Sequence, residues 1–473
     1  MPPIAVSARR GAPEQTDADT RVVGLFEGES IEDASLQALV ESGEAKGGSG
    51  KVAVAHGDRK RVLIAGLGKR DELDAETARV AAAAAAGRAR ELGTRSLSWE
   101  ALDGVAGALV EGTLLRLYRF DRFKSKEDEN DGVESLELAG RTVSEEEVER
   151  ARIGAEAQNK ARDLQNLPAN VATPVFLAER AAEIAAQHDS LELELLDREG
   201  IVAAGMGAFA GVSQGSDQEP RLIVLRYSGG DKGPHLGFVG KAVTFDTGGI
   251  SIKPSAKMHE MKFDMSGGAA VIESLGAIAQ LGLPVTITGV VPATENMPSG
   301  HSMRPGDVVT AMNGTTIEVN NTDAEGRLIL ADALCYAVGQ GVERIVDLAT
   351  LTGAIVVALG STYAGLFSND DDWCGEVEAA GKATGELGWR LPFHKEYEDL
   401  VKGEYADITN APEGRKASSI VGAEFLRRFV DDRPWVHMDI AGTAWGMDRP
   451  YVRKGASGFG VRTLVDLASR NAA

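Results

Sequence analysis

Two segments of the chain combine acidic and basic side chains with apolar, strand-like runs. The first extends from residue 240 to residue 264, and the second, residues 321–328, reads NTDAEGRL. Together they supply four carboxylates, one amine able to ligate a metal and two further cations: Asp246, Asp264, Asp323, Glu325, Lys241, Lys253 and Arg327. Two dications held about 3.5–4 Å apart need a carboxylate-rich set of this kind. The residue types therefore indicate a site for two divalent metal ions.

Lys241 lies within the apolar run LGFVGKAVTF, residues 236–245. A lysine in such a run either reaches the sheet edge or is buried beside a group that it binds. A buried ammonium next to a dication should lose its proton, because burial and like charge both lower its pKa, and the neutral amine can then ligate the metal. A phosphate-binding loop is excluded, since His235 and Ala242 occupy the positions that need glycine and serine or threonine.

The five-residue spacing of Lys241 and Asp246 places a condition on the backbone. In one continuous strand their side chains would point to opposite faces of the sheet. They can converge only if the strand ends before Asp246, and residues 247–249, TGG, are expected to supply that break. Ligands of α/β sheets bind at the carboxyl ends of parallel strands, so we expect the site there.

Helix capping is an alternative role for some of these residues. Asp264 precedes a helix expected over residues 269–281, where an aspartate is a common cap. Thr322 and Glu325 have the spacing of a capping box before a helix expected over residues 328–338. Taken separately, each of these patterns is explained by capping alone.

A second pattern favours a shared binding role. Asp323, Glu325 and Arg327 alternate along the chain, so in an extended stretch all three side chains point to one side. Capping needs only one of the two carboxylates, and it leaves Lys241 unexplained. The choice between capping and shared binding depends on where the helix begins, and the sequence does not determine that residue.

Strands alternate with helices along most of the chain. In the N-terminal part we expect strands at residues 21–26, 51–56 and 61–67 and helices over residues 76–92 and 109–118. Further along we expect strands at residues 191–196, 221–227, 236–245, 285–291 and 344–348, helices over residues 175–187, 269–281 and 328–338, and a hairpin turn at residues 312–315. Such alternation is typical of a largely parallel sheet covered by helices.

The length of 473 residues allows about two or three domains. We expect an α/β protein with a small N-terminal α/β domain over residues 1–143 and a connecting helix over residues 144–168. A larger C-terminal α/β/α domain over residues 169–473, with a mostly parallel central sheet, would contain every candidate site residue.

Composition narrows the class of protein. A formal net charge of −21 repels phosphate backbones and argues against general nucleic-acid binding. The two cysteines, Cys335 and Cys374, form no CxxC pair, and so few favour a reducing compartment and a cytoplasmic protein. Residues 1–20 lack the apolar core of a secretion signal, and no apolar run reaches the ~18 residues of a membrane span. None of the seven histidines has HExxH spacing, which leaves a one-zinc protease unsupported.

The segment NTDAEGRL resembles the signature of the leucyl aminopeptidase family, whose members are also called cytosol aminopeptidases. The spacing from Lys241 to Arg327 is similar to the family's site at every position, although Ser266 stands where many members carry Cys. The resemblance extends over residues 166–174, 239–264 and 347–353, and it is looser in the N-terminal part.

This resemblance implies a metal-dependent aminopeptidase that releases N-terminal residues from peptides by means of a hydroxide bridging two divalent metal ions. One metal would be held by Lys241, Asp246, Asp264 and Glu325, and the other by Asp246, Asp323 and Glu325. Lys253 and Arg327 would be the catalytic pair, with Lys253 stabilising the oxyanion and Arg327 holding a bicarbonate. The pocket for the first substrate residue would be lined by Met261, Thr350, Gly353 and Ala441.

The metal and the assembly are expected from the same resemblance. Oxygen-rich ligands admit Mn²⁺, and the lysine amine is compatible with Zn²⁺. The family implies a homohexamer that acts on peptides. Two alternatives stay open: a two-metal phosphoesterase, which should add histidine ligands and phosphate-binding arginines, and a DNA-binding or regulatory protein on the same scaffold, against which the net charge argues.

Overall fold

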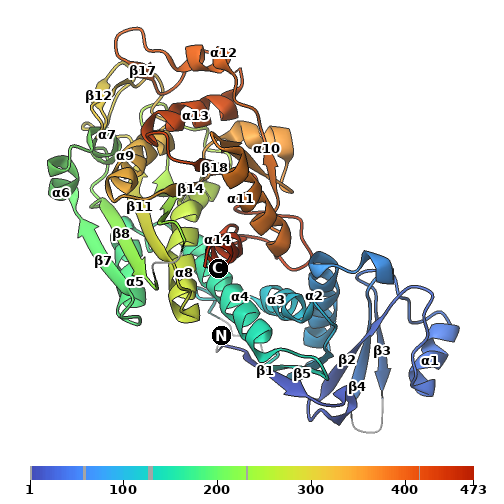
Figure 1. The fold of residues 1–473 in the computed structure, drawn as a ribbon. Coiled ribbons are helices and arrows are strands. Elements are labelled where there is room, and N and C mark those ends of the chain that lie inside the picture. Colours follow the sequence, from blue (N-terminus) through green and yellow to red (C-terminus); the bar gives the residue numbers. More distant parts are fainter. Residues whose placement is uncertain (1–2, 57–59, 126–131, 231–232, 415, 473) are drawn as a thin grey trace. The chain divides into compact units, whose positions relative to one another are not determined.

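The computed structural model describes residues 3–56, 60–125, 132–230, 233–414 and 416–472. The chain divides into two compact units (Figure 1). The first comprises Met1–Asn159 with Asp448–Arg453, and the second comprises Lys160–Met447 with Lys454–Ala473. The division falls within α4 (Glu145–Asn166), the long helix in the region where a connecting helix is expected.

The N-terminal unit is built on a six-stranded sheet in the described part of the chain. Its strands, in spatial order, are β1 (Ala5–Arg10), β6 (Ser135–Gly140), β5 (Ser96–Glu100), β2 (Thr20–Leu25), β4 (Arg61–Gly66) and β3 (Val52–His56). Neighbouring strands are parallel except for the antiparallel pair of β3 and β4. The predicted N-terminal α/β unit is therefore confirmed, with three strands, β1, β5 and β6, that the sequence pattern did not indicate.

Two helices of this unit, α2 (Ala75–Glu91) and α3 (Ala106–Leu117), pack closely together. The Asp74 side chain caps α2 by accepting a hydrogen bond from the amide of Thr77 at 2.8 Å. Small residues allow the close approach: a Cβ added to Gly112 would lie 2.3 Å from the carbonyl oxygen of Arg79. The alanine-rich sequence of α2 thus serves helix packing.

The C-terminal unit is built on a larger sheet, with nine strands in the described residues. Its strands, in spatial order, are β16 (Gly388–Arg390), β15 (Ala364–Ser368), β18 (Trp435–Asp439), β14 (Arg344–Ala349), β9 (Leu236–Gly240), β11 (Thr286–Asn296), β8 (Arg221–Ser228) and β7 (Leu191–Leu196), with β10 (Ala242–Asp246) also paired to β11. The central pairs are parallel, whereas the pairs β7–β8, β8–β11 and β15–β18 are antiparallel. The predicted mostly parallel sheet is confirmed.

Helices cover both faces of this sheet (Figure 1). In one set each helix contacts the next, in the order α5 (Pro174–Ala185), α8 (Ser266–Leu281), α14 (Val461–Arg470) and α11 (Asp371–Thr384). The other set has the order α7 (Gly207–Ser213), α9 (Gly326–Gly339) and α13 (Ser418–Leu426). Both α8 and α9 pack on β9 and β11. The sheet therefore lies between two helical layers, as the α/β/α prediction requires. No described helix combines the length and the apolarity of a membrane-crossing segment.

A small third sheet joins β12 (Val308–Thr310), β13 (Thr316–Glu318) and β17 (Ile408–Thr409). Strands β12 and β13 pair antiparallel on either side of residues 312–315, which confirms the predicted hairpin. Strand β17 adds to β13 in parallel and brings a distant part of the chain to the hairpin.

The strand expected over residues 236–245 is divided at Lys241. The break that must precede Asp246 is therefore present, but it lies at Lys241, and the prediction that residues 247–249 supply it is wrong. The amide of Lys241 donates to the carbonyl of Leu348 in β14 at 3.0 Å, but the carbonyl of Lys241 accepts from the amide of Gly268 in α8 at 2.7 Å. The backbone thus leaves its pairing with β14 at Lys241. Strand β10 then continues through Asp246 with an irregular register against β11.

Helix α9 is anchored by a buried carboxylate. Asp332 is fully buried, and it accepts hydrogen bonds from the amides of Phe209 at 2.8 Å and Met312 at 2.7 Å. It thereby fixes α7 and the hairpin to α9. Burial raises the pKa of Asp332 to about 7.

This shift predicts a pH-dependent stability. The unfolded pKa is about 3.9, so the folded chain binds the proton more tightly, and the free energy of unfolding should fall as the pH rises from about 4 to about 7. The Asp332 contribution is on the order of 4 kcal/mol, at about 1.4 kcal/mol per pKa unit. Urea unfolding with a chelator at pH 5 and pH 8 measures the part of it that is lost between pH 5 and about pH 7, on the order of 3 kcal/mol. Asp332→Asn should reduce this difference, and an unchanged pH slope in that variant would contradict the assignment.

Candidate metal centre

The seven predicted site residues meet at the ends of four elements of the C-terminal unit. They are Lys241 between β9 and β10, Asp246 at the end of β10, Lys253 in the following loop, Asp264 in the 3-10 segment η3 (Met258–Met265), Asp323 and Glu325 in the turn before α9, and Arg327 in its first turn. The structure therefore brings together residues separated by more than eighty positions of sequence.

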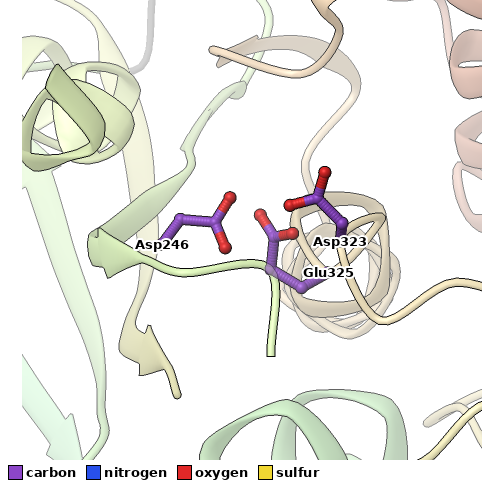
Figure 2. A group of neighbouring side chains, drawn as sticks. All are labelled: Asp246, Asp323 and Glu325. Carbon is purple, nitrogen blue, oxygen red and sulfur yellow. The ribbon is translucent and has the colours of Figure 1, made fainter. Parts of the chain in front are cut away.

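Three carboxylates face one another at the centre of the site (Figure 2). Asp246, Asp323 and Glu325 each place one carboxylate oxygen so that the three oxygens lie within 4.8 Å of one another. Asp246 and Glu325 are buried, whereas the Asp323 side chain keeps 31% of its surface exposed. Such a group of oxygen ligands suits a hard or borderline divalent cation.

Lys241 is buried between two of the acidic residues. Its ammonium lies 2.8 Å from Asp264 and 2.8 Å from Glu325, and it also donates to the carbonyl of Thr350 at 3.1 Å. The side chain passes over Gly326, where an added Cβ would lie 2.6 Å from the Lys241 Cε atom. The glycine of the NTDAEGRL segment therefore makes room for the lysine.

Lys253 returns to the same cluster from the loop after β10. Its ammonium lies 2.7 Å from Asp246 and forms an ion pair with Asp323. The loop folds back through Gly248 and Gly249, whose φ angles of 88° and 63° favour glycine. The TGG segment thus reverses the direction of the chain after Asp246. The turn brings Lys253 to the cluster, whereas Asp246 is already positioned by β10.

The protonation equilibria of the carboxylates reflect their crowding. Burial, together with the charge of Glu325, raises the pKa of Asp246, and burial raises the pKa of Asp264 well above its usual value. Burial and then the charge of Asp246 raise the pKa of Asp323 to about 6. Glu325 is the exception, since Lys241 and Lys253 outweigh burial and lower its pKa.

The lysines neutralise this cluster only in part. Burial alone would lower the pKa of Lys241, but Asp264 and Glu325 raise it overall, and Asp246 has the same net effect on the pKa of Lys253. When all four carboxylates are ionised, these two ammonium groups leave two negative charges in a mostly buried site. Divalent cations would neutralise that charge, so the residues present fit the metal ions that the sequence predicted.

The capping alternatives are wrong for both segments. Helix α8 begins with Met265 at its N-cap position and no side-chain cap, because Asp264 turns to Lys241 and to the Thr350 hydroxyl at 2.7 Å. Thr322 donates to the Gly248 carbonyl at 2.6 Å instead of forming a capping box. The hydrogen-bonding capacity of these side chains is therefore used within the site.

The argument from an extended stretch is also wrong. Glu325 already has helical backbone angles, with φ −74° and ψ −35°, and it holds the N-cap position of α9. Asp323 and Glu325 meet because the chain turns between them, while Arg327 enters from the first turn of the helix. A tight turn, and not an extended strand, therefore brings the three residues together.

Arg327 is buried beside the cluster. Its Nη1 atom donates to the carbonyl of Asn410 at 2.7 Å, whereas its Nε atom has no hydrogen-bond partner among the described residues. Burial lowers the pKa of Arg327 to about 10, against the opposing charges of Glu325 and Asp439. The guanidinium therefore keeps its charge at neutral pH and retains an unused donor.

The four predicted pocket residues lie on three segments around the cluster. Met261 lies in η3 with Asp264, Thr350 follows β14, Gly353 begins α10 (Gly353–Leu359), and Ala441 follows β18. The Asp439 carboxylate links two of these segments, since it accepts hydrogen bonds from the amides of Leu351 at 3.1 Å and Ala441 at 3.3 Å and from the Thr352 hydroxyl at 2.6 Å. One buried side chain thus ties together the loops that follow β14 and β18.

The chain matches one family over both of its units. The profile of the cytosol aminopeptidase family, catalytic domain, matches residues 159–465, and that of the same family's N-terminal domain matches residues 22–127. The chain belongs to the cytosol aminopeptidase family. The family resemblance identified in the NTDAEGRL segment is confirmed.

Relatives with the same family name match along nearly the whole chain. A probable cytosol aminopeptidase of Solibacter usitatus is 47% identical over 470 residues, which cover 96% of this chain and 97% of the relative. A probable cytosol aminopeptidase of Roseiflexus castenholzii is 45% identical over 482 residues, which cover 98% of each chain.

Solved structures of similar proteins share the fold. A mutant of tomato leucine aminopeptidase has a TM-score of 0.90 and 35% identity, over 99% of this chain and 97% of that one. The bottromycin maturation enzyme BotP in complex with Mn has a TM-score of 0.88 and 35% identity, over 96% of this chain and 100% of that one. The predicted fold class is confirmed, and the cytosol aminopeptidase family supports the predicted metal-dependent aminopeptidase.

Sequence analysis missed a buried amide in this family member's site. The Asn296 Nδ2 atom donates to Asp246 at 2.8 Å and to the carbonyl of Thr322 at 3.0 Å, and thereby orients both halves of the carboxylate cluster. Asn296 ends β11, five residues beyond the strand end expected at residue 291. A polar residue at the carboxyl end of a buried strand was the available signal.

Proposed function

We propose that this chain is a two-metal leucyl-type aminopeptidase that releases N-terminal residues from peptides. The observation that carries the proposal is the convergence of Asp246, Asp323 and Glu325 within 4.8 Å, beside two lysines, in a chain of the cytosol aminopeptidase family. A family fold without its ligand residues would not support catalysis. Here the ion pairs of Lys241 and Lys253 with the four carboxylates support the proposed ligand set.

The ligands divide into two overlapping sets. One cation would be held by Lys241, Asp246, Asp264 and Glu325, and the other by Asp246, Asp323 and Glu325. The contacts of Lys241 with Asp264 and Glu325, both 2.8 Å, support the first set, since the amine lies next to both carboxylates. The carboxylate oxygens within 4.8 Å of one another support the second.

When bound, the two cations would supply a hydroxide nucleophile at neutral pH, polarise the scissile carbonyl and hold the free α-amine of the substrate. Lys253 would donate a hydrogen bond to the developing oxyanion, a role supported by its contacts with Asp246 and Asp323. Arg327, which stays protonated, cannot transfer a proton itself. Its unused Nε donor supports the binding of a bicarbonate there.

The substrate pocket would be formed by Met261, Thr350, Gly353 and Ala441. These side chains are small or apolar, which favours a leucine-like first residue. The Thr350 hydroxyl is already committed to Asp264, so Thr350 would also position that ligand.

The metal, the assembly and the location complete the proposal. Mn²⁺ is favoured because a similar structure was determined with Mn, and the Lys241 amine is also compatible with Zn²⁺. We propose a homohexamer and a cytoplasmic location, the latter because Cys335 and Cys374 are both free. The phosphoesterase and the DNA-binding or regulatory protein are not favoured, since the family matches span both units.

A substrate pair tests the proposed function. With Mn²⁺, the protein should hydrolyse leucine p-nitroanilide and should cleave the N-acetylated form about 10- to 100-fold more slowly. Loss of a charged or coordinating contact costs roughly 1.5–3 kcal/mol, and acetylation removes the amine that makes it. Initial rates of nitroaniline release measure both reactions, and equal rates would overturn the exopeptidase assignment.

A further inference from the structure

Asn410 is a fully buried residue that directly follows β17, and its side chain forms four hydrogen bonds. Its Oδ1 atom accepts from the amides of Asn320 at 2.9 Å and Asn321 at 3.3 Å. Its Nδ2 atom donates to the carbonyls of Asn321 at 2.7 Å and Ala324 at 3.4 Å. All four partners are backbone groups of residues 320–324.

Those residues form the turn that places Asp323 and Glu325. Within the turn, the amide of Asp323 bonds to the Asn321 side chain at 2.9 Å, and the amide of Ala324 bonds to the Asn321 carbonyl at 3.2 Å. The middle of the turn is held at Thr322, whose hydroxyl donates to the Gly248 carbonyl at 2.6 Å and whose carbonyl accepts from Asn296 at 3.0 Å. Asn410 forms hydrogen bonds at both ends of the segment, with Asn320 and with Ala324. A shift of this turn would move both carboxylates together.

The side chain of Asn410 is not needed to hold its own strand. The amide of Asn410 donates to the carbonyl of Glu318 at 2.9 Å, which continues the pairing of β17 with β13 through the backbone alone. The carbonyl of Asn410 accepts from Arg327 Nη1 at 2.7 Å, which is again a backbone contact. The four hydrogen bonds of the Asn410 side chain therefore all go to the 320–324 turn.

We propose that Asn410 is a positioning residue that sets the affinity of the site for divalent cations by fixing this turn. The inference rests on the proposed function, because it takes Asp323 and Glu325 as metal ligands. An asparagine suits the role, since only an amide offers an acceptor and two donors in one plane to backbone amides on one side and backbone carbonyls on the other.

Two substitutions test the proposal in the full-length protein. Asn410→Ala removes all four hydrogen bonds. Asn410→Asp keeps the shape and the two accepted bonds but turns a carboxylate oxygen toward the carbonyls of Asn321 and Ala324. Isothermal titration with Mn²⁺ should show about 10- to 100-fold weaker binding in both variants, the range found when groups supporting metal ligands are removed. Deuterium uptake at the amides of Asn320 and Asn321 should be faster.

A buried asparagine elsewhere in the same unit provides the control. Asn471 is 9% exposed, and its side chain donates to the carbonyl of Leu467 at 3.0 Å. Asn471→Ala should lower thermal stability while leaving Mn²⁺ affinity within about twofold of that of the unmodified chain. Equal losses of Mn²⁺ affinity in the Asn471 and Asn410 variants would overturn the proposal, because the effect would then be general destabilisation.

The outcomes separate this proposal from the proposed function. If Asn410→Ala does not fold, Asn410→Asp decides the question, since it preserves the packing volume. Unchanged Mn²⁺ affinity in a folded Asn410 variant overturns the positioning role. If the unmodified chain binds Mn²⁺ but does not cleave leucine p-nitroanilide, the aminopeptidase assignment fails, and the affinity comparison still tests Asn410.

Discussion

Asp323→Ala is expected to abolish loading of the cation assigned to Asp246, Asp323 and Glu325. It should also lower kcat/KM on leucine p-nitroanilide by more than about 100-fold. Removing groups that merely support ligands costs about 10- to 100-fold, so loss of a ligand should exceed that range. The fold should survive, because the side chain is 31% exposed and Lys253 is its ion-pair partner among the residues that the structure describes. Burial and the charge of Asp246 also raise the pKa of Asp323, so its removal relieves repulsion in the chain without metal.

Three measurements check this expectation: metal content after dialysis, kcat/KM and the thermal unfolding temperature with a chelator. Asp307→Ala is a matched control, because Asp307 is 26% exposed and pairs with Arg304 away from the cluster. The control should keep metal content and activity. Unchanged metal content and full activity in Asp323→Ala would remove Asp323 from the site.

Lys253→Met is expected to lower kcat by about 10²- to 10³-fold while metal content is retained. This is the loss measured when one hydrogen-bond donor to an oxyanion is removed. Methionine keeps the length of the side chain but has no charge. Because Lys253 contacts Asp246 at 2.7 Å and also pairs with Asp323, its ammonium competes with cations for those carboxylates. The variant should therefore bind Mn²⁺ at least as tightly as the unmodified chain.

Opposite changes in kcat and metal affinity are the diagnostic result for Lys253. Lys257→Met, at an exposed position of the same loop region, should change neither quantity. If Lys253→Met lost its metal instead, Lys253 would be assigned a role in building the site. If kcat stayed within about threefold, the oxyanion role would be excluded.

The composition of the site could be predicted from the sequence because its residues are concentrated in two short segments. The types of residue in NTDAEGRL and around Lys241 exceed what capping requires, and this excess indicated a metal site. The backbone that unites them could not be predicted in the same way. The turn at Lys241 depends on hydrogen bonds to Leu348 and Gly268, which come from separate elements.

Residues that support the site from a distance were also missed. Asn296, Asn410 and Asp439 each follow or end a strand, but nothing local distinguishes them from ordinary polar residues at strand ends. Their importance arises from partners up to 90 positions away, as for Asn410 and Asn320. The edge strand β1 was missed for a related reason: Arg9 appears unsuited to a strand until Glu137 of β6 pairs with it at 2.8 Å.

The tie made by Asp439 has a consequence for redesign of the enzyme. The loops after β14 and β18 share one buried carboxylate, through Leu351, Thr352 and Ala441. A graft that exchanges only one loop with a relative would leave either the carboxylate or its donors without partners, at a cost of roughly 1–3 kcal/mol for each buried group. A change in selectivity for the first side chain of the substrate should therefore be sought by exchanging both loops together.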